Sequence, residues 1–179
     1  MRAAGREGPA TPAALAYTIF PSPLGLVLAA ATERGLAMVG LGDDVATLEA
    51  ELRCAFPRAA PRRDDAGLSW AAAGLLAYLE GRGDCDGLPV DAAGTPFQRR
   101  VWAALRAIPY GETRTYGQIA EGLGLGRGAA RAVGAACGAN PVSLAIPCHR
   151  AVGGDGRLHG FRWSIARKER LLALERGGV

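Results

Sequence analysis

Short apolar runs separated by turn residues characterise the first third of the chain. Residues 17–20, 26–29 and 36–39 are such runs, and Pro-Ser-Pro-Leu-Gly and Thr-Glu-Arg-Gly lie in the gaps between them. Runs of this length, bounded by proline, glycine and polar residues, are typical of β-strands joined by tight turns. The pattern therefore predicts a small antiparallel meander.

Two helices are predicted after the meander. Asp43 and Asp44 stand where an N-cap belongs, and apolar residues then recur at helical spacing until Pro57 ends the helix. A second apolar stretch with the same period covers residues 68–79. We interpret residues 61–65 as the loop between the two helices. Nothing in this half of the chain has the pattern of a catalytic group.

The pattern becomes mainly helical after Gly94-Thr95-Pro96, which we interpret as a domain boundary. Thr95 can cap a helix that begins at Pro96, and an apolar stripe follows over residues 97–108. The predicted divisions are a flexible leader, a structural N-terminal α/β domain and a functional C-terminal domain, at residues 1–13, 14–93 and 94–179.

A pair of helices joined by a glycine-rich turn is predicted next. Residues 115–118 have the form of a capping box, so the first helix should begin at Tyr116, and the second covers residues 129–137. This is the arrangement of a helix-turn-helix. Arg131 is the one large polar side chain of the second helix, whose small residues suit close approach to a nucleic-acid groove or tight helix packing. The predicted fold class is α+β, with a small antiparallel sheet and helices before a mainly helical C-terminal domain.

Charge divides the chain at the same place. Residues 1–96 hold 8 basic and 12 acidic residues, whereas residues 97–179 hold 13 basic and 5 acidic residues. A basic half beside an acidic half favours contact between the C-terminal part and a polyanion, although exposed arginine faces are common in proteins of any function. Lys168 is the only lysine.

The composition excludes several classes of protein. There is no Cys-x-x-Cys pair and there are two histidines, so no zinc-ligand spacing exists and we expect neither a metal nor a cofactor. No apolar run approaches the length of a membrane span, and the start of the chain lacks the pattern of a signal peptide. We expect a cytoplasmic monomer with free thiols and no membrane contact. The cysteines are Cys54, Cys85, Cys137 and Cys148.

The candidate chemistry lies in Cys148, His149 and Arg150, which end an apolar run that begins after Asn140. A cationic neighbourhood is expected to lower the pKa of the Cys148 thiol and so favour the reactive thiolate. If the run is extended, His149 points away from Cys148 and a proton relay needs a bend or a bridging water. The alternative is a buried cysteine beside a surface His–Arg pair.

Two further features follow this run. Residues 159–163 mix two aromatic rings with an arginine, a combination suited to holding a base that has left its stack. Ser164 can cap a last helix, on which Lys168 and Glu175 share a face because they are two turns apart. A surface Lys and Glu on such a helix otherwise serve only solubility.

Several segments resemble the O6-alkylguanine-DNA alkyltransferases, which repair methylated guanine, and they occur in the order of that family. The resemblance covers nearly all of residues 95–176 and extends more loosely to residues 41–44 and 56–57, as in the C-terminal half of bacterial Ada proteins. The segments are residues 97–102, 108–113, 130–134, 140–141, 146–150 (Ile-Pro-Cys-His-Arg) and 167–172.

The resemblance implies a role for each candidate residue of the reaction. Cys148 would accept the alkyl group, and His149, through a water, and Glu175 would form a relay that maintains the thiolate. Asn140 would brace the turn that presents the cysteine. Lys168 would help to stabilise the departing guanine.

The resemblance also implies a mode of DNA binding through the minor groove of a duplex that contains O6-alkylguanine. Tyr116 would help to rotate the target nucleotide, and Arg131, between Ala130 and Gly134 on the DNA-binding helix, would fill the gap left in the stack. His159 and Phe161 stand where bacterial relatives often carry serine and tyrosine. The implied base pocket contains Ala151, His159, Gly160, Phe161 and Trp163.

The implied reaction is stoichiometric transfer of an alkyl group from O6-alkylguanine, and from O4-alkylthymine, to Cys148. A thioether product has no easy leaving group, so the protein should act once. The main alternative is a non-catalytic protein that binds alkylated DNA and recruits other repair, but in those relatives tryptophan replaces the reactive cysteine. A cysteine hydrolase would need an oxyanion-hole loop, and an Ada-type regulator would need further domains; neither is found in this sequence.

Overall fold

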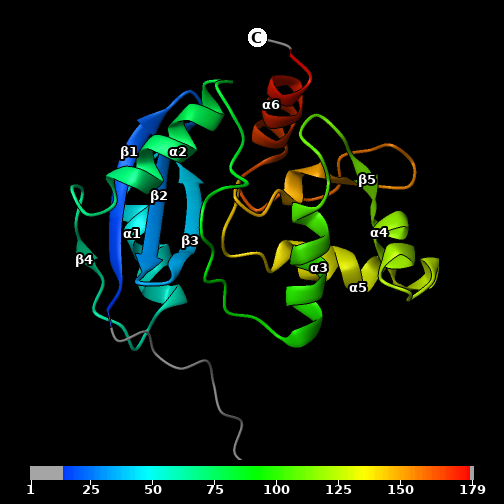
Figure 1. Ribbon diagram of the computed structural model, residues 1–179, viewed down its shortest axis with the longest axis horizontal. Helices are drawn as coiled ribbons and strands as arrows, with labels where there is room; N and C mark the ends of the chain where they lie inside the picture. The colour runs from blue at the N-terminus through cyan, green and yellow to red at the C-terminus, as the bar shows by residue number, and fades with distance from the viewer. Residues whose placement is uncertain (1–13, 178–179) are drawn as a thin grey trace, which may run out of the picture.

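The computed structural model describes residues 14–177, and the predicted leader therefore lies outside the described residues (Figure 1). Three strands form the predicted antiparallel meander, β1 (Ala16–Ser22), β2 (Gly25–Thr32) and β3 (Gly35–Gly42). Their short turns place Gly25 and Gly35 at positive φ, of 99° and 142°, which a residue without Cβ tolerates. The strand order in the sheet is β3-β2-β1-β4.

The fourth strand corrects the predicted loop at residues 61–65. Here β4 (Arg62–Arg63) pairs parallel to β1, so the sheet is mixed and not purely antiparallel. Arg62 N donates to Leu15 O, and Asp64 N donates to Tyr17 O, both at 2.9 Å. Both arginine side chains are exposed, and the strand therefore lacks the apolar alternation by which a half-buried strand is recognised.

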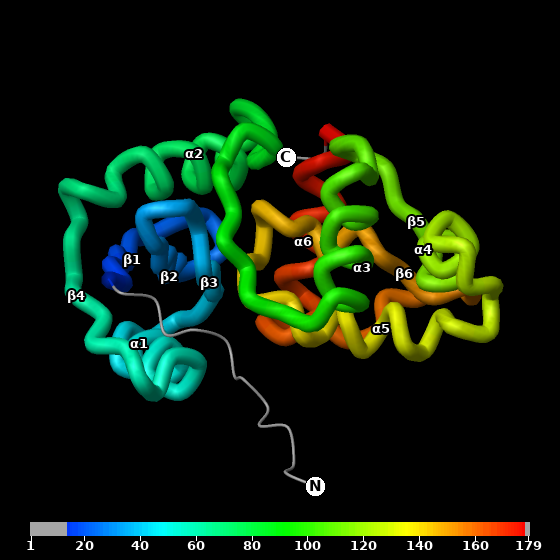
Figure 2. The backbone as a smooth tube through the Cα atoms, turned by 60° about the horizontal axis from the view of Figure 1, so that its bottom comes forward, coloured from blue at the N-terminus to red at the C-terminus, as the bar shows by residue number. Residues whose placement is uncertain are grey.

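Two helices cover opposite faces of the sheet, α1 (Val45–Ala55) and α2 (Ser69–Leu79), as Figure 2 shows. As predicted, Asp44 caps α1 by accepting a hydrogen bond of 2.7 Å from Thr47 N. Leu48 and Leu52 of α1 pack on one face of the sheet, whereas the buried side chains of α2 belong to the core that also includes side chains of the C-terminal helices. Residues of α2 can therefore reach groups that lie far away in the sequence.

The C-terminal part is mainly helical, as predicted. Thr95 and Thr115 each form a capping box, with Gln98 and Gln118 respectively, at the starts of the predicted helices. Ser164 caps the last helix as predicted. The elements are α3 (Pro96–Arg106), β5 (Arg114–Thr115), α4 (Tyr116–Gly122), η1 (Arg127–Ala129), α5 (Ala130–Gly138), η2 (Cys148–Arg150), β6 (Ala151–Val152) and α6 (Ile165–Glu175).

One hydrophobic core crosses the predicted boundary at residues 94–96. It joins the α2 face of the sheet to α3, α5 and α6, through side chains such as Leu75, Leu105, Val133 and Leu171. The backbone makes the same connection, because Val39 N of β3 donates a 2.9 Å hydrogen bond to Pro141 O. Among residues 14–177, no helix is long and apolar enough to cross a membrane.

Candidate active site

A braced turn presents Cys148 at the start of η2. The Asn140 side chain donates to Ile146 O and accepts from Val142 N, both at 2.9 Å, so it ties the two ends of the turn together. Leu144 adopts φ +70°, and residues 148–150 form a 3-10 turn. The run before Cys148 is therefore bent and not extended, and the expectation of alternating side chains does not apply.

A cavity of about 920 Å³ opens beside Cys148, a size within the range of small-molecule sites. Its walls come from the start of α4, from α5 and from the loop that leads to α6. Tyr116 and Arg131 line it from the helix-turn-helix side, and Phe161 and Trp163 line it from the loop. The full lining is Tyr116, Ala130, Arg131, Gly134, Cys137, Gly138, Cys148, Gly153, Gly154, His159, Gly160, Phe161, Arg162 and Trp163.

The structure brings most of the predicted pocket residues to this cavity. Of the five base-pocket candidates, four line its wall, and the aromatic rings of Phe161 and Trp163 meet edge to face at 5.3 Å. Ala151 is the exception, because it is fully buried and is absent from the lining. All four DNA-binding candidates line the cavity, namely Tyr116, Ala130, Arg131 and Gly134. Cys137, expected in the core, is buried and also lines the wall.

Burial controls the electrostatics of Cys148. It raises the pKa of the thiol, and the Asn140 amide and the Lys168 charge act in the opposite direction without reversing the shift. The expectation of a lowered thiol pKa is therefore wrong. The resting sulfur is a thiol at neutral pH, and its reaction as a thiolate requires a group that takes the proton.

His149 is the natural candidate for the group that takes the proton of Cys148. It is fully buried, and its Nε2 lies 2.9 Å from Glu175 Oε1. Burial lowers the pKa of His149, although Glu175 acts in the opposite direction, and the ring is therefore neutral at pH 7. Its Nδ1 is buried and has no hydrogen-bond partner among the described residues. A neutral imidazole with one free nitrogen can accept a proton.

Arg150 forms an ion pair with Glu175 and does not interact with Cys148. Its guanidinium contacts both carboxylate oxygens, and its Nη1 donates a 2.6 Å hydrogen bond to Ile108 O. Burial opposes ionisation of Glu175, but hydrogen bonds from His149 and Arg150 outweigh it and lower the pKa of the carboxyl to about 2. Within residues 14–177, Lys168 is the cationic side chain whose charge lowers the pKa of the thiol.

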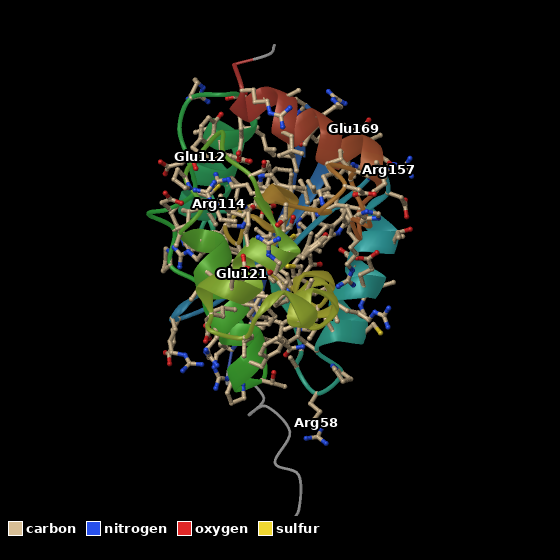
Figure 3. All side chains as sticks on the ribbon, turned by 90° about the vertical axis from the view of Figure 1, so that its right-hand side faces the viewer. Arg58, Glu112, Arg114, Glu121, Arg157 and Glu169 are labelled. Atoms are coloured by element: carbon tan, nitrogen blue, oxygen red, sulfur yellow. The ribbon has the colours of Figure 1, made fainter. Side chains whose placement is uncertain are left out.

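Lys168 and Glu175 lie inside the protein, which excludes the interpretation of a solvated pair. Lys168 is fully buried, and its Nζ donates to Ala151 O at 2.7 Å and to His159 O at 3.2 Å. Charged residues of the same region, such as Arg157 and Glu169, lie at the surface (Figure 3). The ammonium of Lys168 is absent from the cavity wall and holds the backbone behind it.

One residue of the site has no counterpart in the sequence-based predictions. Tyr78 of α2 is fully buried, and its hydroxyl lies 2.6 Å from Glu175 Oε1 and 3.0 Å from His149 Nε2. It comes from the half in which no catalytic pattern was found. The one signal in the sequence is a tyrosine on the apolar face of a helix, because a buried hydroxyl needs a partner.

Metal binding has no support in this site. Among residues 14–177, no three His, Cys, Asp or Glu side chains are grouped closely enough to hold a metal ion. The four cysteines are all free thiols, with Cys54 exposed and the other three buried. Two of these thiols, Cys137 and Cys148, line the cavity.

Comparison with known proteins agrees with this geometry. Residues 15–92 match the ribonuclease-like domain of 6-O-methylguanine DNA methyltransferase, and residues 96–177 match its DNA-binding domain. The methylated-DNA--protein-cysteine methyltransferase of Methanosarcina acetivorans is 38% identical over 159 residues, which are 89% of this chain and 97% of that protein. The chain belongs to this methyltransferase family.

Other members of the methyltransferase family extend the comparison. The Escherichia coli bifunctional transcriptional activator/DNA repair enzyme Ada is 44% identical over 162 residues, which are 90% of this chain and 46% of Ada. The chain thus spans about half the length of Ada. Mycobacterium tuberculosis OGT, in a crystal structure in complex with DNA, superposes with a TM-score of 0.76 at 38% identity, over 91% of this chain and 94% of that one. The predicted family and α+β fold class are confirmed.

Proposed function

We propose that this protein repairs DNA by moving the alkyl group of O6-alkylguanine, and of O4-alkylthymine, onto Cys148 in one irreversible step. The observation that carries the proposal is that Cys148 lines a cavity of about 920 Å³ and is followed in the chain by His149, which is paired with the carboxylate of Glu175. The family to which the chain belongs supports it. Double-stranded DNA is the proposed partner.

The transfer needs one proton to move and one bond to be exchanged. The Cys148 proton passes to His149, through a water, and the sulfur attacks the alkyl carbon in line with the carbon–oxygen bond. The carbon–sulfur bond forms as the carbon–oxygen bond breaks, and the guanine keeps the electron pair of the broken bond. It takes up one proton from solvent water, which makes it a better leaving group. Glu175 stabilises the positive charge that develops on the imidazole, because it is ionised and in contact with Nε2.

The wall of the cavity suits a nucleotide that has left its stack. Extrusion costs a few kcal/mol, and a side chain inserted into the duplex offsets part of that cost. Arg131 is exposed at the rim, on a helix whose other residues near it, Ala130 and Gly134, are small. We assign Arg131 to the gap in the duplex and Tyr116, at the start of α4, to the rotation of the nucleotide.

Lys168 takes a supporting role in this proposal. Its Nζ donates to the carbonyl oxygens of Ala151, just before the loop that lines the cavity, and of His159, within that loop. Asn140 has the same kind of role for the turn before Cys148. Both residues therefore act on the shape of the site, and the positive charge of Lys168 also favours the thiolate.

Mass spectrometry of peptides tests the proposal. The protein is incubated with a duplex that contains one O6-methylguanine, and the Cys148 peptide should gain one methyl group per molecule, without turnover. Cys148→Ser should gain none. Methylation of the exposed Cys54 instead would indicate unspecific alkylation, and binding of the methylated duplex with no mass gain would favour the non-catalytic alternative. Either result would reject the proposal.

Two further proposals concern the location and the domains of the protein. The cysteines of residues 14–177 are free thiols, which suits a reducing cytoplasm. We also propose the division into domains at residues 14–93 and 94–179, with the first presenting Tyr78 and the second carrying the transfer site. Limited proteolysis that cuts first between residues 90 and 96 would support this division.

A further inference from the structure

Tyr78 connects the N-terminal half of the chain to the buried pair of His149 and Glu175. It lies on α2, whereas its partners His149 and Glu175 lie on η2 and α6, 71 and 97 residues further along the chain. Its ring packs edge to face on Tyr110, with centroids 6.1 Å apart. The hydroxyl is therefore held by packing on one side and by two polar partners on the other.

The protons of this network can be counted. Glu175 accepts hydrogen bonds from Arg150 at both oxygens and from Gly111 N at 3.2 Å. Since an arginine does not lose its proton in proteins, the carboxylate in this contact is ionised and has no proton to donate. Burial raises the pKa of Tyr78 well above its ordinary value, and the phenol therefore keeps its single proton.

That single proton goes to Glu175, because the Tyr78 Oη to Glu175 Oε1 distance of 2.6 Å is typical of a hydrogen bond from a hydroxyl to a charged acceptor. The hydroxyl then offers His149 only lone pairs. Nε2 of His149 thus faces two acceptors, Glu175 Oε1 at 2.9 Å and Tyr78 Oη at 3.0 Å. A nitrogen between two acceptors must carry the hydrogen.

We propose that Tyr78 is a positioning residue of the alkyl transfer, which fixes His149 in the Nε2–H tautomer and so keeps Nδ1 free to take the thiol proton. The inference rests on the proposed function and deepens it. In the opposite tautomer, the lone pair of Nε2 would face two acceptors and Nδ1 would carry a proton, so the imidazole could not receive one from Cys148. The N-terminal half thereby takes part in the reaction through one hydroxyl.

The test compares Tyr78→Phe with Tyr17→Phe. The second is a matched control, since Tyr17 also donates a hydrogen bond of 2.7 Å from a tyrosine to a glutamate, Glu49, but on the far face of the sheet. Two quantities are measured in each protein: the single-turnover rate on O6-methylguanine duplex across pH, and the tautomer of His149 by nitrogen NMR. His149 can be assigned with a His159→Gln variant, because the chain has two histidines.

Tyr78→Phe should lower the rate by about tenfold, as loss of an outer hydrogen-bond partner commonly does, and should raise the population of the Nδ1–H tautomer. Tyr17→Phe should leave both unchanged. An unchanged tautomer in Tyr78→Phe overturns the proposal even if the rate falls, because the tyrosine then only supports the fold. If the wild-type protein fails to methylate Cys148, the proposed function falls, and the tautomer measurement still decides the role of Tyr78.

Discussion

Arg150 and Glu175 form a bidentate ion pair in the interior, in which Arg150 Nη2 lies 2.9 Å from Glu175 Oε1 and Arg150 Nε lies 3.0 Å from Glu175 Oε2. Their side chains are 2% and 0% exposed. The arginine of the Cys-His-Arg segment is thus absent from the cavity wall and compensates the charge of the carboxylate that contacts His149. A histidine–carboxylate pair in the interior would otherwise carry an unpaired charge, which is costly.

Removal of the Arg150 guanidinium should therefore lower the stability of the fold. In Arg150→Met, the apolar part of the side chain is retained but Glu175 loses its charged partner, and we expect a loss of about 3–5 kcal/mol in the free energy of unfolding by urea. Arg114→Met is the control, because Arg114 pairs with Glu112 at 2.8 Å with both side chains about half exposed. That control should change by less than about 1 kcal/mol. Equal losses in the two variants would contradict a buried pair.

The contribution of Glu175 should depend on pH. Its folded-state pKa of about 2 lies below the ordinary value of 4.5, so its stabilising effect is present above about pH 4.5 and is lost as pH falls through about 2. The shift corresponds to roughly 3 kcal/mol. The difference in unfolding free energy between wild type and Glu175→Gln should therefore shrink as the pH is lowered from 5 toward 2. A difference that stays constant over this range would show that folding does not lower the pKa of Glu175.

The sequence predicted those parts of the protein that depend on neighbours in the chain. Thr95 and Thr115 cap helices because their partners, Gln98 and Gln118, follow three residues later. The strands of the meander follow from short apolar runs between turn residues. Local chemistry of this kind is visible before folding, and the cap at Thr95 and the capping box at residues 115–118 were predicted at the correct residues.

The parts that the sequence did not reveal depend on distant partners. Tyr78 meets Glu175 only because α2 packs against the core that includes α6. The pKa of Cys148 was predicted in the wrong direction because His149 is neutral, Arg150 is paired with Glu175, and burial dominates. β4 escaped prediction because it pairs through its backbone and exposes both side chains.

The pH dependence of the transfer should distinguish a relay from a free thiolate. Burial raises the pKa of Cys148 and lowers the pKa of His149, so the wild-type protein has a neutral thiol beside a neutral base over a wide range. The single-turnover rate should be level around neutral pH and should fall only at a pH below the ordinary pKa of histidine, about 6.5, where His149 becomes protonated.

The matched variant for this measurement is His149→Phe. Without a base the reaction needs the ionised sulfur, and the rate should be at least about 100-fold lower at pH 7 and should rise steadily with pH. A wild-type rate that itself rises tenfold per pH unit through neutral pH would refute proton transfer to His149. Circular dichroism of both proteins at each pH would confirm that the fold is retained.

A variant of Arg131 can separate the extrusion of the base from the transfer of its alkyl group. Arg131→Ala should slow repair of O6-methylguanine in duplex DNA by roughly 10–100-fold, because extrusion loses the side chain that fills the stack. Free O6-benzylguanine needs no extrusion, and its reaction with Cys148 should change little. Arg58→Ala is the control for loss of one positive charge, since Arg58 is exposed at the end of the molecule far from α5 (Figure 3). Equal losses on duplex and free base in Arg131→Ala would remove the role in extrusion, because a free base has no stack to leave.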